Sequence, residues 1–89
     1  MVIKKKAIAG TVESSDLLVQ IEPGSGGLQV SIQSVVKERF GHLIEATVHG
    51  VLKDFGVENA TVYIDDRGAL DCVIRARVET AIRRGAEEV

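Results

Sequence analysis

The spacing of hydrophobic residues changes abruptly at Ser34. Before that residue, apolar and polar side chains alternate in residues 28–33, and a period of two is typical of a strand with one buried and one wet face. From Val35 the apolar residues recur every three or four positions as far as Phe55, and Gly56 follows as a helix stop. A strand that leads directly into a long amphipathic helix predicts a helix packed on a sheet.

The same reasoning predicts three more strands and one more helix. The strands are expected at residues 7–12, 17–23 and 58–64, and the second helix at residues 69–84. The order strand, strand, strand, helix, strand, helix predicts an α+β fold. It should be a two-layer sandwich in which both helices cover one face of a four-stranded mixed sheet. Residues 1–89 are expected to form a single domain.

Each predicted element has an expected orientation. Ile8 and Val12 should share one face of the first strand, and Gly10 between them is a place where a neighbouring group approaches closely. Ser34 is predicted to cap the first helix, while Asp65 and Asp66 are predicted to cap the second. The expected core stripes are Val36, Phe40, Leu43, Ile44, Thr47, Val48, Val51, Leu52 and Phe55 in the first helix and Leu70, Val73, Ile74, Val78 and Ala81 in the second.

A short polar segment separates the first two strands and predicts a tight hairpin turn. Ser14 and Ser15 should lie at its exposed tip, between the carboxylates of Glu13 and Asp16. Another protein can reach a hydroxyl group in such a loop, so the position suits covalent modification. The plainer interpretation is that Ser and Asp are common turn residues because their side chains bond to nearby backbone groups.

The composition argues against several kinds of partner. Eleven basic and thirteen acidic residues give a net charge of -2, so no basic surface for nucleic acid is expected, and two Phe and one Tyr leave little for base stacking. The single cysteine, Cys72, forms no internal disulfide. No stretch is long and apolar enough for a signal peptide or a membrane span. These features predict a cytoplasmic protein that binds neither nucleic acid nor membrane.

Few groups are candidates for catalysis or ligand binding. The glycine-rich loop at residues 24–27 is not followed by the helix that a phosphate cradle needs. Glu38, His42, Glu45 and His49 share one helix face and could in principle hold a metal, but a solvated or partner-contacting face explains the same residues, and no other segment offers an obvious further ligand. No catalytic residue and no metal ligand is therefore predicted, and no independent enzymatic activity is expected.

Four segments closely resemble the acyl carrier protein, or gamma subunit, of bacterial citrate lyase. They are Ala9-Gly10-Thr11, Glu13-Ser14-Ser15-Asp16, Asp-Asp-Arg-Gly-Ala-Leu-Asp-Cys at residues 65–72 and Arg-Ala-Arg-Val-Glu at residues 75–79. In that family the serine after the glutamate carries phosphoribosyl-dephospho-coenzyme A through a phosphodiester, and the tip reads Glu-Ser-Ser-Asp or Glu-Ser-Gly-Asp. The resemblance implies that Ser14 is the attachment residue, flanked by Glu13, Ser15 and Asp16 as recognition residues.

The resemblance also implies partners. A prosthetic-group transferase would attach the arm, whose thiol carries acetyl as a thioester. The alpha subunit (acyl transferase) would exchange acetyl for citrate, and the beta subunit (citryl lyase) would release oxaloacetate. Three alternatives stay open: the carrier subunit of malonate decarboxylase, the carrier of a citramalate lyase, and an unmodified regulatory or assembly module.

The carboxylates of Glu13 and Asp16 suggest one further hypothesis. A phosphodiester on Ser14 keeps a negative charge, and a carboxylate about 4 Å away would repel it by roughly 1 kcal/mol in water. The two carboxylates would then hold the arm away from the carrier surface.

Overall fold

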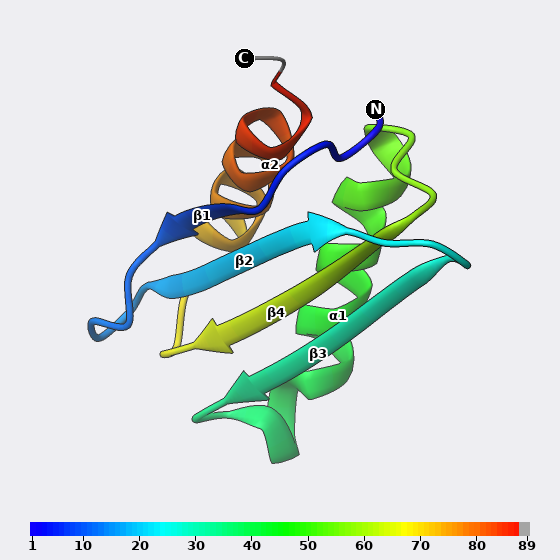
Figure 1. The fold of residues 1–89 in the computed structure, drawn as a ribbon. Helices are drawn as coiled ribbons and strands as arrows, with labels where there is room; N and C mark the ends of the chain where they lie inside the picture. The colour runs from blue at the N-terminus through cyan, green and yellow to red at the C-terminus, as the bar shows by residue number, and fades with distance from the viewer. Residues whose placement is uncertain (88–89) are drawn as a thin grey trace.

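The computed structural model describes residues 1–87. It consists of four strands and two helices in the predicted order (Figure 1). The elements are β1 (Ala7–Gly10), β2 (Leu17–Pro23), β3 (Leu28–Ser34), α1 (Lys37–Asp54), β4 (Ala60–Asp66) and α2 (Asp71–Ala86). The predicted α+β fold is confirmed.

The sheet is mixed and has the strand order β1-β2-β4-β3. β2 pairs antiparallel with both β1 and β4, whereas β3 and β4 are parallel because α1 carries the chain back between them. In this register Leu17 and Ser34 both lie opposite Asp66. The hairpin between β1 and β2 and the last residues of β3 and β4 therefore lie at the same end of the sheet.

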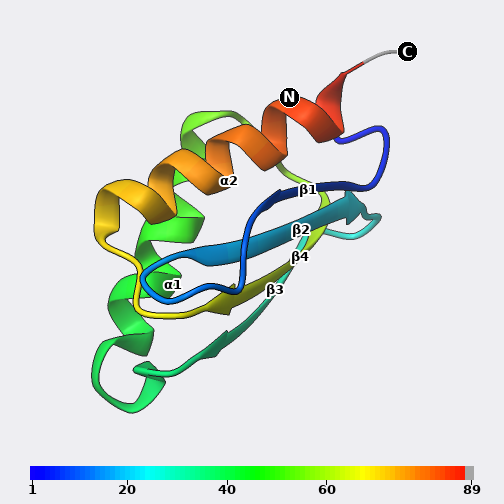
Figure 2. The same ribbon diagram turned by 90° about the vertical axis from the view of Figure 1, so that its left-hand side faces the viewer.

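Both helices lie on one face of the sheet, as predicted (Figure 2). The open face carries mainly polar side chains, of which Tyr63 donates a hydrogen bond of 3.2 Å to Gln33. Between sheet and helices lies one hydrophobic core, and it includes Leu17, Val19 and Ile21 of β2, Val62 and Ile64 of β4, Val48 and Leu52 of α1, and Val78 and Ile82 of α2. No helix among residues 1–87 is long and apolar enough to cross a membrane.

The first strand differs from its prediction. β1 ends at Gly10 rather than at Val12, and it buries Ala7 and Ala9 while Ile8 and Val12 are exposed. Ala and Ile are both apolar, so the alternation in this short strand does not identify the inner face. The alanines face the helix layer, where β1 lies against α2 and small side chains allow close packing.

The predicted helix caps are wrong. α1 begins at Lys37 and α2 at Asp71, and neither helix has a side-chain cap. The Ser34 hydroxyl donates to the Asp66 carboxylate (2.7 Å) and accepts a hydrogen bond from the Val36 amide. Asp66 is buried and also accepts hydrogen bonds from the amides of residues 68 and 69, so it ties together the β4–α2 loop and the end of β3.

The core stripes of the two helices were predicted correctly except in the first two turns of α1, at the start of α2 and at Ile82, which is buried in α2 but was not predicted. Phe40, Leu43 and Leu70 are exposed, although each was predicted to face the core. In Figure 2 the first turns of both helices lie at the end of the strands or beyond it. These side chains therefore have few strand residues to pack against, which leaves an apolar surface at this end of the molecule.

Candidate functional site

The segment between β1 and β2 forms a tight turn with exposed serines. The amide of Asp16 donates to the carbonyl of Glu13 (3.2 Å), which closes a four-residue turn with Ser14 and Ser15 at its centre. Ser15 has a φ of 65° and is the one non-glycine residue with positive φ among residues 1–87. Positive φ at the third position of a turn favours Gly or Asn, so the turn must be held in place by other contacts.

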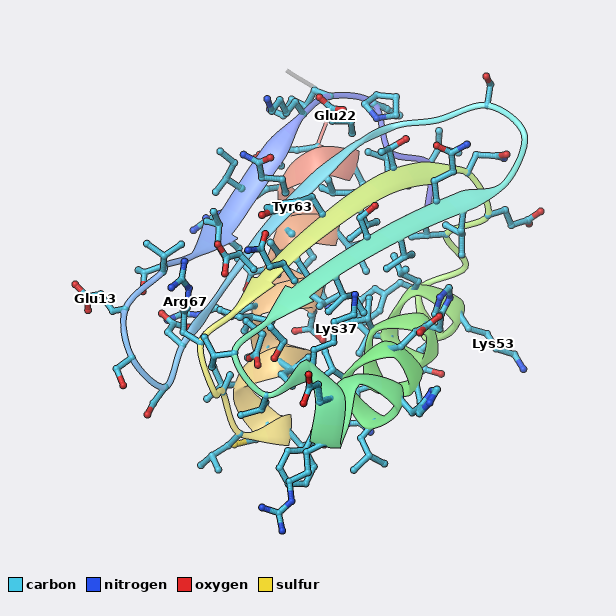
Figure 3. All side chains as sticks on the ribbon, turned by 90° about the horizontal axis from the view of Figure 1, so that it is seen from below. Glu13, Glu22, Lys37, Lys53, Tyr63 and Arg67 are labelled. Atoms are coloured by element: carbon cyan, nitrogen blue, oxygen red, sulfur yellow. The ribbon has the colours of Figure 1, made fainter. Side chains whose placement is uncertain are left out.

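The tip of this turn is bonded to the loop that follows β4. The amide of Ser15 donates to the carbonyl of Arg67 (2.9 Å), and the amide of Arg67 donates to the carbonyl of Asp16 (2.9 Å). Glu13 and Arg67 lie at the same end of the sheet, where Glu13 points away from the molecule (Figure 3). The site is therefore built from two loops, and Ser14 is exposed on a turn whose backbone is held in place by the second loop.

Asp16 anchors the base of the turn. Its carboxylate accepts hydrogen bonds from the Thr11 hydroxyl (2.8 Å), the Leu17 amide (2.8 Å) and two nitrogens of the Arg77 guanidinium (both 3.0 Å). The hydrogen bond from Arg77 is the main reason that the pKa of Asp16 falls from its ordinary 3.8 to about 2. Partial burial opposes this effect, and the bonds from Thr11 and Leu17 add to it.

This environment bears on the proposed repulsion of the arm. The negative charge of Asp16 is compensated by Arg77, and its carboxylate is largely enclosed by its hydrogen-bond donors. Asp16 therefore positions the turn, and its charge contributes little to the repulsion of a nearby phosphodiester. Glu13 is exposed, and its amide donates to the Thr11 hydroxyl (3.2 Å). Any repulsion must therefore come from Glu13.

The paired aspartates after β4 have separate structural roles. Asp65 forms a two-pronged ion pair with Arg67, with nitrogen–oxygen distances of 2.9 and 3.2 Å. Asp66 organises the loop as described above. Neither carboxylate is free to act as a general base or metal ligand in this arrangement.

The polar face of α1 does not form a metal site. Glu45 and His49 approach each other to 3.9 Å, but no group of three or more His, Cys, Asp or Glu residues within the described part of the chain could hold a metal ion. Cys72 is exposed and carries a free thiol.

Sequence reasoning missed the role of Arg77. It lies four residues after Val73 and four before Ala81, so a charged residue interrupts the core-facing side of α2. Such a position calls for a carboxylate partner. That signal could have identified Arg77, but not that its partner is Asp16, 61 residues away.

Comparisons with known proteins agree on one family. Residues 4–85 match the family model described as acyl carrier protein, malonate decarboxylase delta subunit. The citrate lyase acyl carrier protein of Pectobacterium atrosepticum is 52% identical over 98% of this chain and 91% of its own length. That of Klebsiella pneumoniae is 48% identical over 99% and 92%.

The fold also matches a solved structure. A chain in the crystal structure of a Pseudomonas malonate decarboxylase hetero-tetramer in complex with malonate superposes with a TM-score of 0.81. It is 26% identical, and the match covers 92% of this chain and 84% of that one.

Proposed function

Because this chain belongs to the citrate lyase acyl carrier protein family, we propose that it carries acetyl and citryl groups on a phosphoribosyl-dephospho-coenzyme A arm attached to Ser14. Its partners would be the alpha (acyl transferase) and beta (citryl lyase) subunits, which cleave citrate to acetate and oxaloacetate. The chain would contribute no catalytic group of its own.

The observation that carries this proposal is the braced and exposed position of Ser14. The turn is held by the backbone bonds to Arg67 and by the Asp16–Arg77 pair, while Ser14 itself is exposed to solvent. These residues fit a covalent arm, since the hydroxyl is open to an enzyme and its support is rigid. When attached, the arm supplies a thiol that carries acyl groups as thioesters.

The attachment step needs a base from the transferase. The Ser14 oxygen would form a bond to phosphorus while the donor's leaving group departs with its electron pair, and the hydroxyl proton must be removed. Asp16 is a poor base, because its pKa is about 2 and its carboxylate already accepts four hydrogen bonds. The role of this chain is to present the nucleophile in a fixed position.

Intact mass measurement after co-expression with the transferase and the catalytic subunits tests the proposal. The wild-type chain and Ser15→Ala should each gain one adduct of the mass of the arm, and Ser14→Ala should gain none. An adduct that disappears only in Ser15→Ala would move the attachment to the neighbouring residue. A wild-type chain without an adduct would leave an unmodified assembly or regulatory module as the better description.

A malonate decarboxylase carrier is the second candidate, because the family model and the superposed chain both come from that enzyme. The higher identity to citrate lyase carriers, 52% against 26%, favours citrate lyase. Reconstitution with citrate, citramalate or malonate distinguishes the substrates. Cleavage of citrate should be the fastest reaction if the first proposal is correct.

A further inference from the structure

We propose that an apolar groove beside Ser14 is the docking site for the transferase that attaches the arm. The groove has a volume of about 470 Å³ and lies between the first turns of α1 and α2. Its apolar lining includes Val36, Phe40, Leu43, Ala69, Leu70 and Ile74. This inference rests on the proposed function, because it names a protein that acts on the same serine.

The exposure of the lining is unusual for side chains that serve only the fold. Leu70 is 70% exposed, Leu43 is 64% exposed and Phe40 is 42% exposed. Clustered exposed apolar side chains on a soluble domain mark interaction surfaces more often than single ones do. A hollow of this size can receive one or two side chains of a partner.

The groove is continuous with the loop that supports the modified serine. Gly68 and Ala69 line it, and they directly follow Arg67, whose backbone is bonded to Ser15 and Asp16. From the length of these backbone steps, the rim of the groove lies roughly 10 Å from Ser14. A protein seated over the serine therefore reaches the groove.

The transferase is the partner that must be seated there. Before modification only the short Ser14 side chain is available, so the enzyme has to approach the hydroxyl to bonding distance and cover the surface around it. A standard interface buries about 800 Å² on each partner, equivalent to a disc of roughly 16 Å radius. The catalytic subunits act on the far end of the arm, so their contacts with the carrier need not cover the surface around Ser14.

The charges at the rim indicate what the transferase should present. Arg39 lies over the Phe40 ring, 5.7 Å from its centre, and no carboxylate partner is found for it within residues 1–87. Asp71 is already bound by the Thr47 hydroxyl (2.7 Å) and by Arg75 (2.8 Å). The complementary surface is therefore an apolar side chain flanked by a carboxylate that meets Arg39.

The test uses the unmodified carrier, the purified transferase and its activated phosphoribosyl-dephospho-coenzyme A donor. Leu70→Ser and Arg39→Glu should each lower kcat/KM for modification at least tenfold, through KM, with kcat within twofold. Val2→Ser, at a residue 72% exposed, and Lys53→Glu, in the last turn of α1, are matched controls and should stay within twofold. Leu70→Met should keep most of the activity, and thermal unfolding of each variant checks that it is folded.

Calorimetric binding of the unmodified carrier to the transferase separates the two proposals. If the wild-type chain gains no adduct, the proposed carrier function fails. The docking proposal is then tested by whether Leu70→Ser and Arg39→Glu weaken binding to the transferase tenfold. Unchanged kinetics and binding in both variants would overturn the inference. The inference would also be overturned if Leu70→Ser abolished self-association in sedimentation experiments, because a second copy of the chain would then occupy the groove. If the groove were covered only after modification, the arm would be the occupant, and this too would overturn the inference.

Discussion

The carboxylate of Asp16 accepts hydrogen bonds from three separate parts of the chain. Thr11 belongs to the turn, Leu17 begins β2 and Arg77 lies in α2, so one side chain fixes the hairpin relative to the helix layer. Asp16 and Arg77 are partly enclosed, with side-chain exposures of 15% and 41%. The position of Ser14 thus depends on a residue whose carboxylate is bound within the carrier itself.

The lowered pKa of Asp16 predicts a pH-dependent contribution to stability. Because its folded pKa is about 2, below the ordinary 3.8, the pair with Arg77 stabilises the fold above pH 4, and this gain is lost progressively as the pH falls from 4 through 2. Asp16→Asn should lower the free energy of unfolding by about 1 kcal/mol at pH 6, since solvent screening weakens the pair, and by clearly less near pH 2, where about half of the Asp16 carboxyl groups are protonated. Urea unfolding between these pH values measures the difference.

A matched control for this prediction is Glu79→Gln. Glu79 forms an exposed ion pair with Arg83 at 3.8 Å, so its replacement should cost less than about 0.5 kcal/mol at any pH. An equal loss for Asp16→Asn at pH 2 and pH 6 would contradict the assigned role of the Asp16–Arg77 pair.

If Ser14 carries the proposed arm, Glu13 is the residue that would repel it. Its carboxylate is exposed, and repulsion of a phosphodiester about 4 Å away is worth roughly 1 kcal/mol at low salt. In the modified carrier Glu13→Gln should therefore reduce the mobility of the arm, measured by phosphorus relaxation, and the difference should shrink in high salt. Asp16→Asn is the control, because it removes a charge that Arg77 already compensates, and it should change the mobility of the arm less than Glu13→Gln does. Equal mobility in wild type and Glu13→Gln would contradict the hypothesis.

At the scale of elements, the β1–β2 hairpin depends on the glycine at the end of β1. Gly10 has a φ of 87°, and a Cβ there would overlap the carbonyl oxygen of Leu17. Gly10→Ala should destabilise the fold by about 3 kcal/mol or more, because the backbone strain and the clash add together. Thermal or urea unfolding measures this loss.

Gly26→Ala provides the comparison for Gly10→Ala. Gly26 also has positive φ, 99°, but an added Cβ there would meet nothing within 4 Å. The cost should therefore be about 1 kcal/mol, from backbone strain alone. Similar losses at the two glycines would mean that the close approach of Leu17 is relieved by a small backbone shift.

Local patterns predicted the strands in which apolar and polar side chains alternate. The alternation in β2 and β4 identifies their inner faces, because the buried positions are apolar except Asp66 and the outer ones are mostly polar. The start of α1 could not be predicted in this way, since the Ser34 side chain bonds to Asp66, 32 residues later. The Asp16–Arg77 pair could not be predicted from local patterns either, because the two residues are 61 positions apart. The resemblance indicated Ser14 but not the contacts that support it.

At the scale of the whole molecule, the core and the site are separate. Every residue of the core cluster lies outside the turn at residues 11–16, and the site depends on the core only through the ends of the strands and Arg77. The molecule is small, with principal extents of 35, 23 and 17 Å, and the turn projects at one end of the sheet. A carrier of this shape can present its serine without a conformational change of its own.

If the proposed function is correct, tethering should dominate the rate of the complete complex. An arm fixed to a carrier that is bound in the complex keeps its acyl group near the active sites at an effective concentration in the millimolar range. Replacing the modified carrier with the same arm free in solution at about 10 μM should therefore lower citrate cleavage roughly 100-fold. Raising the free arm to millimolar concentration should restore the rate, whereas adding unmodified carrier should not. Equal cleavage with free and tethered arms at 10 μM would mean that this fold contributes recognition by the catalytic subunits rather than proximity.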